Sequence, residues 1–416
     1  MKLKEILQSN PNQNIILFGA AEILGKLAYH AFKNLGVDIK GFYDSDDRKQ
    51  GTLFCNKKIL NEKELSELPN DTAFFISNQY IRSVTTFLKQ KNFHNIFDCV
   101  ELLENTDFSK IKMDFNQYQH NAIQREIAHH KHACEKYYDK AKDVLNLKAM
   151  DIVVTERCSM KCRDCSNLMQ YYVRPQNAEI NKMFKSLDRL MNSIDWLYEF
   201  RVLGGDPFMN KEVYKIINKL VEYNNVNYVV IYTNATITPK NENFECLKNK
   251  KIILDITNYG SKLSRKHDEL IKILKENNIN HRSKFPDDWT DSGTLKYYDR
   301  SKEELQRVFD NCCMSDITTL MKGVLYRCPY AANATTLNAV PFKEEEVVNL
   351  NNEKYNLETL RNKIRNFNKS NKPLTACSYC GGRDFKTRKI EAAVQTKKPL
   401  EYKQQDVHDA YKSGLS

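Results

Sequence analysis

Short apolar runs alternate with amphipathic stretches along most of this sequence, and that alternation is its strongest constraint on the fold. Between residues 13 and 105, the runs NIILFG, IKGFYDSD, TAFFIS and NIFDCV are strand-like, with helical patterns between them. Strands separated by helices predict a parallel sheet covered by helices. We therefore expect an α/β fold, with a first parallel-sheet domain in residues 1–110.

The same alternation resumes at Met150 with the runs MDIVVT, EFRVLGG, NYVVIYTN and KIILDITN. This regular repeat suits a partial (β/α) barrel in residues 149–300, in which the loops after the carboxyl ends of the strands carry the chemistry. Residues 111–148 contain no Gly or Pro and predict a helical linker between the two regions.

The remaining third of the chain is less regular. A small cysteine-bearing domain is expected in residues 301–396 and a polar tail in residues 397–416. A chain of 416 residues with 41% hydrophobic residues can bury several cores, so two to four domains are expected.

The amino-terminal sequence and the distribution of charge indicate the cellular compartment and the kinds of partner to expect. The start, MKLKEILQSNPNQ, lacks the apolar core of a signal peptide, and no apolar run reaches the roughly 18 residues of a membrane span. We expect a cytoplasmic protein with no membrane partner. The net charge of +11 comes from 64 basic and 53 acidic residues that are interleaved, which favours a solvated surface over a nucleic-acid footprint.

Two glycines and an acid in the first domain raise the question of nucleotide binding. The segment FGAAEILGK contains Gly19 and Gly25, and the next strand-like run ends in Asp44. In a Rossmann unit such glycines admit a phosphate and the acid binds ribose. Here Ala21 replaces the middle glycine and the spacing is one residue longer. A Rossmann-like scaffold with an ordinary turn is therefore the alternative to a nucleotide site. The stretch resembles small Rossmann-like domains of sugar-modifying enzymes in bacterial glycan pathways.

Three cysteines directly follow the run MDIVVT, as Cys158, Cys162 and Cys165. In a reducing compartment, clustered cysteines indicate ligands rather than disulfides. Three thiolates are one ligand short of a closed zinc or iron–sulfur site, so an iron–sulfur cluster here would stay open to an exogenous molecule. The alternatives are a structural zinc site or three unrelated thiols.

The C-x3-C-x2-C pattern after the first barrel strand resembles the hallmark of the radical S-adenosylmethionine (SAM) superfamily. The resemblance covers residues 150–390. It implies a [4Fe-4S] cluster on these cysteines, SAM on the fourth iron, and a 5'-deoxyadenosyl radical that abstracts hydrogen from a substrate. No further catalytic residue is identified.

The next loops extend the resemblance. LGGDP resembles the family's G-G-E-P motif, with Asp206 in place of Glu, and TNAT resembles its T-N-G. The resemblance implies that the SAM contacts come from Gly204, Gly205, Asp206, Pro207, Thr233, Asn234 and, as a ribose contact, Asn258. The segment DDWTDSG, with Trp289, belongs either to a substrate pocket or to a surface loop.

A second cysteine set lies in the later domain. Its members are Cys312, Cys313, Cys328, which follows Gly323 at G-x4-C, and the pair Cys377 and Cys380. The pattern resembles the twitch domain, a shortened SPASM domain, and implies an auxiliary [4Fe-4S] cluster. Cys312 and Cys313 both fit the spacing, and zinc is the alternative metal.

These features lead to ranked functions. The first is a radical SAM oxidoreductase, either a dehydrogenase or an epimerase, acting on a sugar or nucleotide sugar in glycan or secondary-metabolite biosynthesis. Flavodoxin or ferredoxin would be its reductant. The second is a peptide-modifying radical SAM enzyme, and RNA modification comes third. A non-catalytic binding protein with structural metal sites is the reading from a different class.

Overall fold

The computed structural model describes residues 14–115, 117–138, 144–286, 288–384 and 387–403. The chain divides into two compact units, residues 1–142 and 143–416, which we treat separately. Residues 139–143 of the predicted linker, residues 404–416 of the predicted tail and Asp287 lie outside the described residues.

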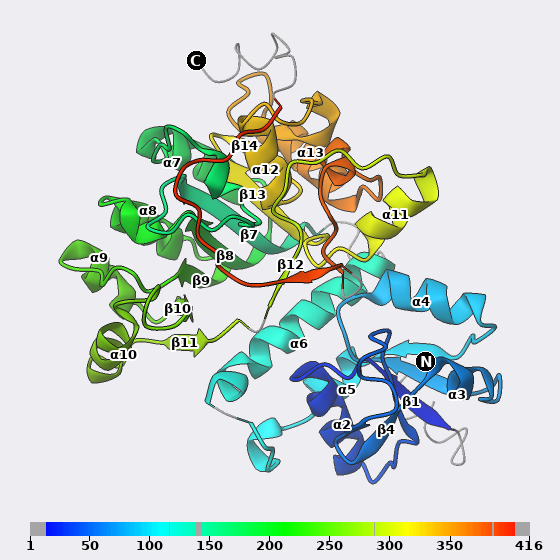
Figure 1. Cartoon of the computed structure of the whole chain (residues 1–416). Helices are drawn as coiled ribbons and strands as arrows, with labels where there is room; N and C mark the ends of the chain where they lie inside the picture. The colour runs from blue at the N-terminus through cyan, green and yellow to red at the C-terminus, as the bar shows by residue number, and fades with distance from the viewer. Residues whose placement is uncertain (1–13, 116, 139–143, 287, 385–386, 404–416) are drawn as a thin grey trace. The chain divides into compact units, whose positions relative to one another are not determined.

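A mostly parallel sheet forms the centre of the first unit (Figure 1), with the strand order β3-β4-β2-β1-β5-β6. Only β3 runs antiparallel to its neighbour. The strands are β1 (Ile15–Phe18), β2 (Gly41–Tyr43), β3 (Leu53–Phe54), β4 (Lys57–Leu60), β5 (Ala73–Ile76) and β6 (Ile96–Asp98). The parallel strands and the helices between them agree with the sequence. The assignment as a Rossmann-like domain stays a prediction.

Helices cover this sheet, and each buries its apolar side. They are α2 (Leu24–Asn34), α3 (Glu62–Ser66), α4 (Ile81–Gln90), α5 (Val100–Glu104), η1 (Phe108–Lys110) and α6 (Gln117–Tyr138). Helix α6 lies in the predicted linker, yet Ile123 and Ile127 pack into the same core as Phe42 and Phe75. By its contacts, α6 is therefore part of the first unit.

The second unit contains an eight-stranded sheet with the order β11-β10-β9-β8-β7-β13-β14-β15. Neighbours from β11 to β13 are parallel, whereas β14 and β15 are antiparallel. The strands are β7 (Asn146–Thr155), β8 (Trp196–Gly204), β9 (Val226–Thr233), β10 (Ile252–Thr257), β11 (His281–Lys284), β13 (Ile317–Met321), β14 (Val324–Tyr326) and β15 (Val348–Asn349). Mixed α/β structure with parallel sheets is confirmed, and closure into a partial barrel stays a prediction.

One face of this sheet is apolar and covered by helices. Alternate strand residues such as Ile152, Val202 and Ile231 pack against α7 (Ile180–Met191), α8 (Val213–Glu222), α10 (His267–Glu276) and α13 (Leu357–Lys369). Because side chains alternate between faces, the residues between them point to the other face, which we call the inner face. Asp151, Arg201 and Asp255 lie there.

Short elements complete the second unit. They are η2 (Met169–Tyr171), η3 (Pro207–Met209), α9 (Glu242–Glu245), η4 (Cys246–Lys248), β12 (Trp289–Thr290), α11 (Lys302–Asp310), α12 (Pro329–Thr336), η5 (Glu344–Glu346), η6 (Thr375–Ser378) and β16 (Lys389–Ile390). Strands β12 and β16 pair antiparallel. Among the described residues, no helix combines the length and the apolar character needed to span a membrane.

Candidate functional site

The loops after β7, β8, β9 and β10 lie at one edge of the second sheet, because parallel strands bring their carboxyl ends together. The loop after β7 carries the first three cysteines, and the loop after β8 carries Asp206. The loop after β9 carries Asn234, and the loop after β10 carries Asn258. The structure thus gathers at one edge the motifs that the sequence placed on separate strands.

Cys158, Cys162 and Cys165 belong to a single small apolar cluster. Their neighbours in it are Met160, Tyr259, Leu263, Trp289 and Ala393. An apolar surrounding excludes water from thiolate ligands and from whatever they hold. The three cysteines therefore lie in one cluster, and their role as ligands of a shared iron–sulfur cluster stays a prediction.

Hydrogen-bond donors point at each of these sulfurs. The Gln395 amide donates to Cys162 Sγ at 3.2 Å, and the Asn234 amide lies 3.6 Å from Cys158 Sγ. The Cys165 sulfur accepts from backbone N–H groups of residues 167–169. Donors to sulfur are typical of iron–sulfur ligands. Burial raises the pKa of Cys162 to about 12, so these donors help to offset the cost of deprotonating the thiol.

A C-terminal stretch, residues 393–396, runs antiparallel to the cysteine loop. Arg163 N donates to Val394 O at 2.7 Å, and Thr396 N donates to Lys161 O at 2.7 Å. The stretch leads on from β16, which Figure 1 shows in red. We call it the strap. Sequence reasoning did not identify Gln395 or the strap.

Gly204 and Gly205 press the second loop against the cysteine loop. A Cβ on Gly205 would lie 1.9 Å from Arg157 O, and one on Gly204 would lie 2.1 Å from Thr155 O. Asp206 N donates to Arg157 O at 2.9 Å. These glycines thus let the loop after β8 approach the backbone next to Cys158, whether or not a ligand also binds there.

Asp206 is fully buried and its carboxylate is already engaged. One oxygen accepts from Phe208 N at 3.1 Å, and the other accepts from Thr233 Oγ1 at 2.8 Å and Asn234 N at 3.0 Å. Pro207 follows as the first residue of η3. The structure therefore shows Asp206 positioning the loop after β9, and its predicted contact with SAM stays a prediction.

The remaining predicted contacts take local structural roles as well. Asn258 Oδ1 accepts from Gly260 N at 2.8 Å, which shapes the loop after β10. In the DDWTDSG segment, Trp289 packs edge-on against Tyr259 with the ring centroids 5.8 Å apart. A Cβ on Gly293 would lie 2.3 Å from Asp164 O. This segment thus forms part of the wall around the cysteines.

The second cysteine set also converges. Four of its thiols line one small cavity: Cys312, Cys328, Cys377 and Cys380. Cys313 does not line that cavity and is exposed. The geometry therefore favours Cys312 as the fourth ligand, a choice that spacing left open.

Donors also surround this cavity. Cys328 Sγ accepts from Ala331 N at 3.3 Å, Cys312 Sγ from Met314 N at 3.4 Å, and Cys380 Sγ from Gly382 N at 3.5 Å. Arg300 donates to the carbonyls of Cys377 and Cys380 at 2.6 and 2.8 Å, which fixes their loop. Four converging thiols with donors to their sulfurs fit a four-iron cluster.

The spacing of the thiols bears on the choice between a zinc ion and a four-iron cluster. Among the residues that the structure describes, no three or more His, Cys, Asp or Glu side chains are grouped closely enough to hold one metal ion. Thiolates that share a four-iron cluster bind different irons, so they stand farther apart than the ligands of one zinc ion.

The inner face of the second sheet carries a layer of polar side chains. Arg201 Nε lies 3.0 Å from Asp151 Oδ1, and Arg282 Nε donates to Asp255 at 2.8 Å. The Arg201 guanidinium lies over the Tyr232 ring, 5.2 Å from its centroid. Burial raises the pKa of Asp151 to about 6, against the opposing effect of Arg201.

Some of these polar atoms are unsatisfied within the described residues. Glu199 Oε2 and Thr319 Oγ1 are buried and have no hydrogen-bond partner there. Buried polar atoms normally find partners, so such a set marks a place for water or a polar ligand. A sequence signal existed, because Asp151, Arg201 and Asp255 interrupt otherwise apolar strand-like runs.

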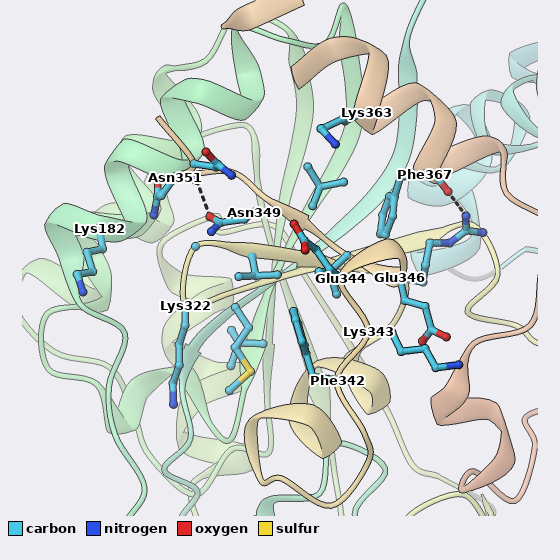
Figure 2. A pocket seen from close by; sticks show the side chains of 18 of the residues that line it. Lys182, Lys322, Phe342, Lys343, Glu344, Glu346, Asn349, Asn351, Lys363 and Phe367 are labelled. Atoms are coloured by element: carbon cyan, nitrogen blue, oxygen red, sulfur yellow. Dashed lines mark hydrogen bonds between the residues drawn. The ribbon is translucent and has the colours of Figure 1, made fainter. Parts of the chain in front are cut away.

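A larger cavity of about 1530 Å³ shares lining residues with the four-cysteine cavity. Its lining includes Thr155 and Glu156, just before the cysteine loop, and also Arg327 and Leu374, which line the four-cysteine cavity too. Lys322 Nζ pairs with Glu156 at 3.0 Å, and Figure 2 shows Lys322, Lys343 and Glu346 among the lining side chains.

In the first unit, Gly19 and Asp44 meet. Ala20 N and Lys49 Nζ both donate to Asp44 Oδ2 at 2.9 Å. A Cβ on Gly25 would lie 2.7 Å from Gly19 O, so Gly25 allows α2 to pack against this turn. The acid is engaged within the protein, and nucleotide binding here stays a prediction.

Comparison with known families supports the iron–sulfur reading of the first site. Residues 150–274 match a family model described as a 4Fe-4S single cluster domain. That segment contains Cys158, Cys162 and Cys165, so the prediction of a [4Fe-4S] cluster in this part of the chain is confirmed. The match also supports the radical SAM interpretation. It ends before the second cysteine set.

A curated relative matches over a shorter stretch. GTP 3',8-cyclase from Clostridium acetobutylicum is 31% identical over 96 residues, which is 23% of this chain and 30% of the cyclase. The match thus spans less than a third of that protein.

Solved structures give weaker likenesses. A crystal structure of BtrN in complex with AdoMet and 2-DOIA aligns with a TM-score of 0.39 and 15% identity, over 62% of this chain and 98% of BtrN. Streptococcus suis SuiB bound to the precursor peptide SuiA aligns with a TM-score of 0.30 and 16% identity, over 59% of this chain and 53% of SuiB. TM-scores this low support no inference about fold or substrate.

Proposed function

We propose that this chain is a radical SAM enzyme with an auxiliary [4Fe-4S] cluster, and that it oxidises or epimerises a carbohydrate-type substrate. The observation that carries the proposal is the convergence of Cys158, Cys162 and Cys165 in one apolar cluster, with a hydrogen-bond donor at each sulfur. Three thiolates leave one iron of a four-iron cluster for SAM, and the bound cluster supplies the electron for radical chemistry.

The chain's own residues hold and shield this site. Asp206 fixes Thr233 and Asn234, and Asn234 in turn reaches the Cys158 sulfur. Gly205 keeps the loop after β8 in backbone contact with the cysteine loop. Trp289 and Tyr259 cover the cysteines with aromatic surface, which excludes water from reactive species.

The inner face supports a polyhydroxylated substrate. Its buried oxygens without a hydrogen-bond partner among the described residues, Glu199 Oε2 and Thr319 Oγ1, suit hydroxyl groups, and an apolar substrate would leave them unpaired. The cavity of about 1530 Å³ exceeds the roughly 300–1,000 Å³ of ordinary small-molecule sites. That size favours an extended substrate, such as a nucleotide sugar, and it also supports the second candidate, a peptide.

The test supplies SAM and a one-electron reductant of the flavodoxin or ferredoxin type to anaerobically reconstituted protein, with panels of nucleotide sugars and of peptides. We expect 5'-deoxyadenosine, together with a ketone or an inverted centre on a sugar. Glu199→Gln should reduce sugar turnover at least tenfold, since an unpaired buried polar group costs about 1–3 kcal/mol. The exposed Glu222→Gln is the matched control.

Other outcomes separate the alternatives. Modified peptide with untouched sugars would replace the substrate proposal by the peptide one. Iron without any SAM cleavage, under every reductant tried, would favour a binding protein with structural clusters. Nucleotide binding by Gly19, Gly25 and Asp44 would appear as a Kd that weakens in Asp44→Asn.

A further inference from the structure

Arg383 reaches both thiol sets. Its side chain lines the cavity that Cys312, Cys328, Cys377 and Cys380 share. One of its terminal nitrogens donates to the carbonyl of Ser166 at 2.9 Å, and Ser166 directly follows Cys165. One guanidinium therefore connects the wall of the second site to the loop of the first, across 217 residues of sequence.

The backbone before Arg383 is shaped to place it there. Gly382 has a φ of +104°, a conformation that favours glycine, and its N–H donates to Cys380 Sγ. A Cβ on Gly381 would lie 2.0 Å from Asp291 O. Gly382 thus provides the turn between Cys380 and Arg383, and Gly381 lets this turn pass close to the backbone of Asp291.

Several thiols and one acid are among the titratable groups that interact with Arg383. The guanidinium interacts electrostatically with Cys380, Cys313, Cys312 and Cys328 of the second set and with Cys165 of the first. The buried Asp151 on β7 also faces it. Arg383 keeps its positive charge at any working pH, because a guanidinium does not deprotonate in proteins.

A fixed cation beside a cluster alters its redox balance. Reduction adds one negative charge to the cluster, and a nearby positive charge stabilises that charge. The hydrogen bonds and charges around the sulfurs are among the factors that set cluster potentials. A cation that lies between two thiol sets also lowers the electrostatic repulsion between the negatively charged clusters that the sets would hold.

We propose that Arg383 is the positioning residue that ties the first cysteine loop to the second cysteine cavity, and that its charge raises the reduction potential of the cluster held there. The inference rests on the proposed function, because it requires that the second site hold iron and sulfide.

The test is a redox titration followed by EPR in a Cys158→Ala/Cys162→Ala/Cys165→Ala background, in which only the later cluster is present. In Arg383→Gln, the ratio of reduced to oxidised cluster at a fixed potential should fall about tenfold, which is 59 mV for a one-electron couple. Arg388→Gln, which removes an exposed charge five positions on, should leave the ratio unchanged.

Arg383→Lys separates charge from shape. It keeps the cation, so its ratio should stay within about twofold of the parent even if less cluster is retained. An unchanged ratio in Arg383→Gln, or an equal fall in Arg383→Lys, would overturn the inference.

Hydrogen exchange in the full chain tests the positioning half. Arg383→Gln should speed amide exchange in residues 163–168, while Arg388→Gln should not. Equal exchange in all three proteins would overturn this half. If the parent background binds no iron, the auxiliary cluster of the proposed function fails, and the redox half of the inference fails with it.

Discussion

Cys312 and Cys313 are neighbours in sequence, but only Cys312 lines the cavity of the second set. Cys312 lines the cavity of the second set and accepts a hydrogen bond from Met314 N, whereas Cys313 is exposed. Spacing could not separate them, because a one-residue shift is within the tolerance of the motif. The direction of each side chain depends on the turn after α11, which is set by tertiary packing.

This difference predicts unequal effects of two alanine variants. Cys312→Ala should lose about four of about eight irons per chain, because the second cluster loses a ligand. Cys313→Ala should retain all of them. Iron and sulfide assays on the reconstituted variants test this prediction. Loss of iron in Cys313→Ala alone would show that Cys313, and not Cys312, is the fourth ligand.

His130 in α6 is buried as a neutral ring. Cys99 N donates to its Nε2 at 3.2 Å, and its Nδ1 donates to Asn78 O at 2.8 Å. Burial lowers its pKa below the usual 6.5. Below about pH 6.5, His130 is therefore protonated in the unfolded chain but stays neutral in the folded unit. Protonation stabilises the unfolded chain, so the free energy of unfolding falls as the pH drops below that value.

We predict that the first unit loses about 1 kcal/mol of stability per pH unit below 6.5 through this one residue. Hydrogen exchange of peptides from β1 and β5, at pH 7.5 and 5.5, measures it after correction for intrinsic rates. His130→Gln should flatten this dependence, and the exposed His94→Gln should not. An equally steep dependence in His130→Gln would refute the assignment.

The strands and the loops that follow them could be predicted, because each strand corresponds to a local run of apolar residues. The apolar runs became strands, and the cysteine, glycine and T-N loops met at one sheet edge, because parallel strands leave no other arrangement. The strap was not predictable. It is only four residues long and pairs with a loop more than 200 residues away, so no periodicity in the sequence predicts it.

Some residues that the sequence assigned to SAM binding also have a structural role in the protein. Asp206 was assigned by resemblance to SAM, yet its carboxylate accepts three hydrogen bonds from the protein itself. Glycines that suggest room for a ligand can instead serve the packing of two loops, as Gly205 does. A sequence pattern identifies such a position, but it does not tell whether a bound ligand or a neighbouring segment of the protein requires that residue.

The strap should protect the first cluster. Thr396→Pro removes the N–H that bonds Lys161 O, so it should loosen residues 161–163 and weaken the Gln395 contact with Cys162. We expect faster loss of iron from this variant under a chelator, with Thr396→Ala close to wild type because it keeps the N–H. Equal rates in the three proteins would show that the strap does not protect the site.

At the scale of the molecule, the two units have separate cores. The two apolar clusters of the first unit use residues up to 137, and the largest cluster of the second unit begins at Leu145. Both thiol sets lie in the second unit. Each unit therefore has the apolar burial needed to fold by itself.

A fragment of residues 144–416 should accordingly bind as much iron as the whole chain. Both tryptophans, Trp196 and Trp289, lie in it, so tryptophan fluorescence follows the unfolding of this unit alone. We expect similar midpoints in urea for the fragment and the full chain. A fragment that is unfolded, or that binds much less iron, would mean that the first unit is required for the fold of the second.

The most direct test of the whole account is the iron and sulfide content of the anaerobically reconstituted chain and of two variants. One variant lacks Cys158, Cys162 and Cys165, and the other lacks Cys377 and Cys380. We predict about eight irons in the full chain and about four in each variant, with four-iron EPR signals on reduction. Zinc in the second site would contradict the auxiliary cluster, and absence of iron from all three proteins would contradict the account as a whole.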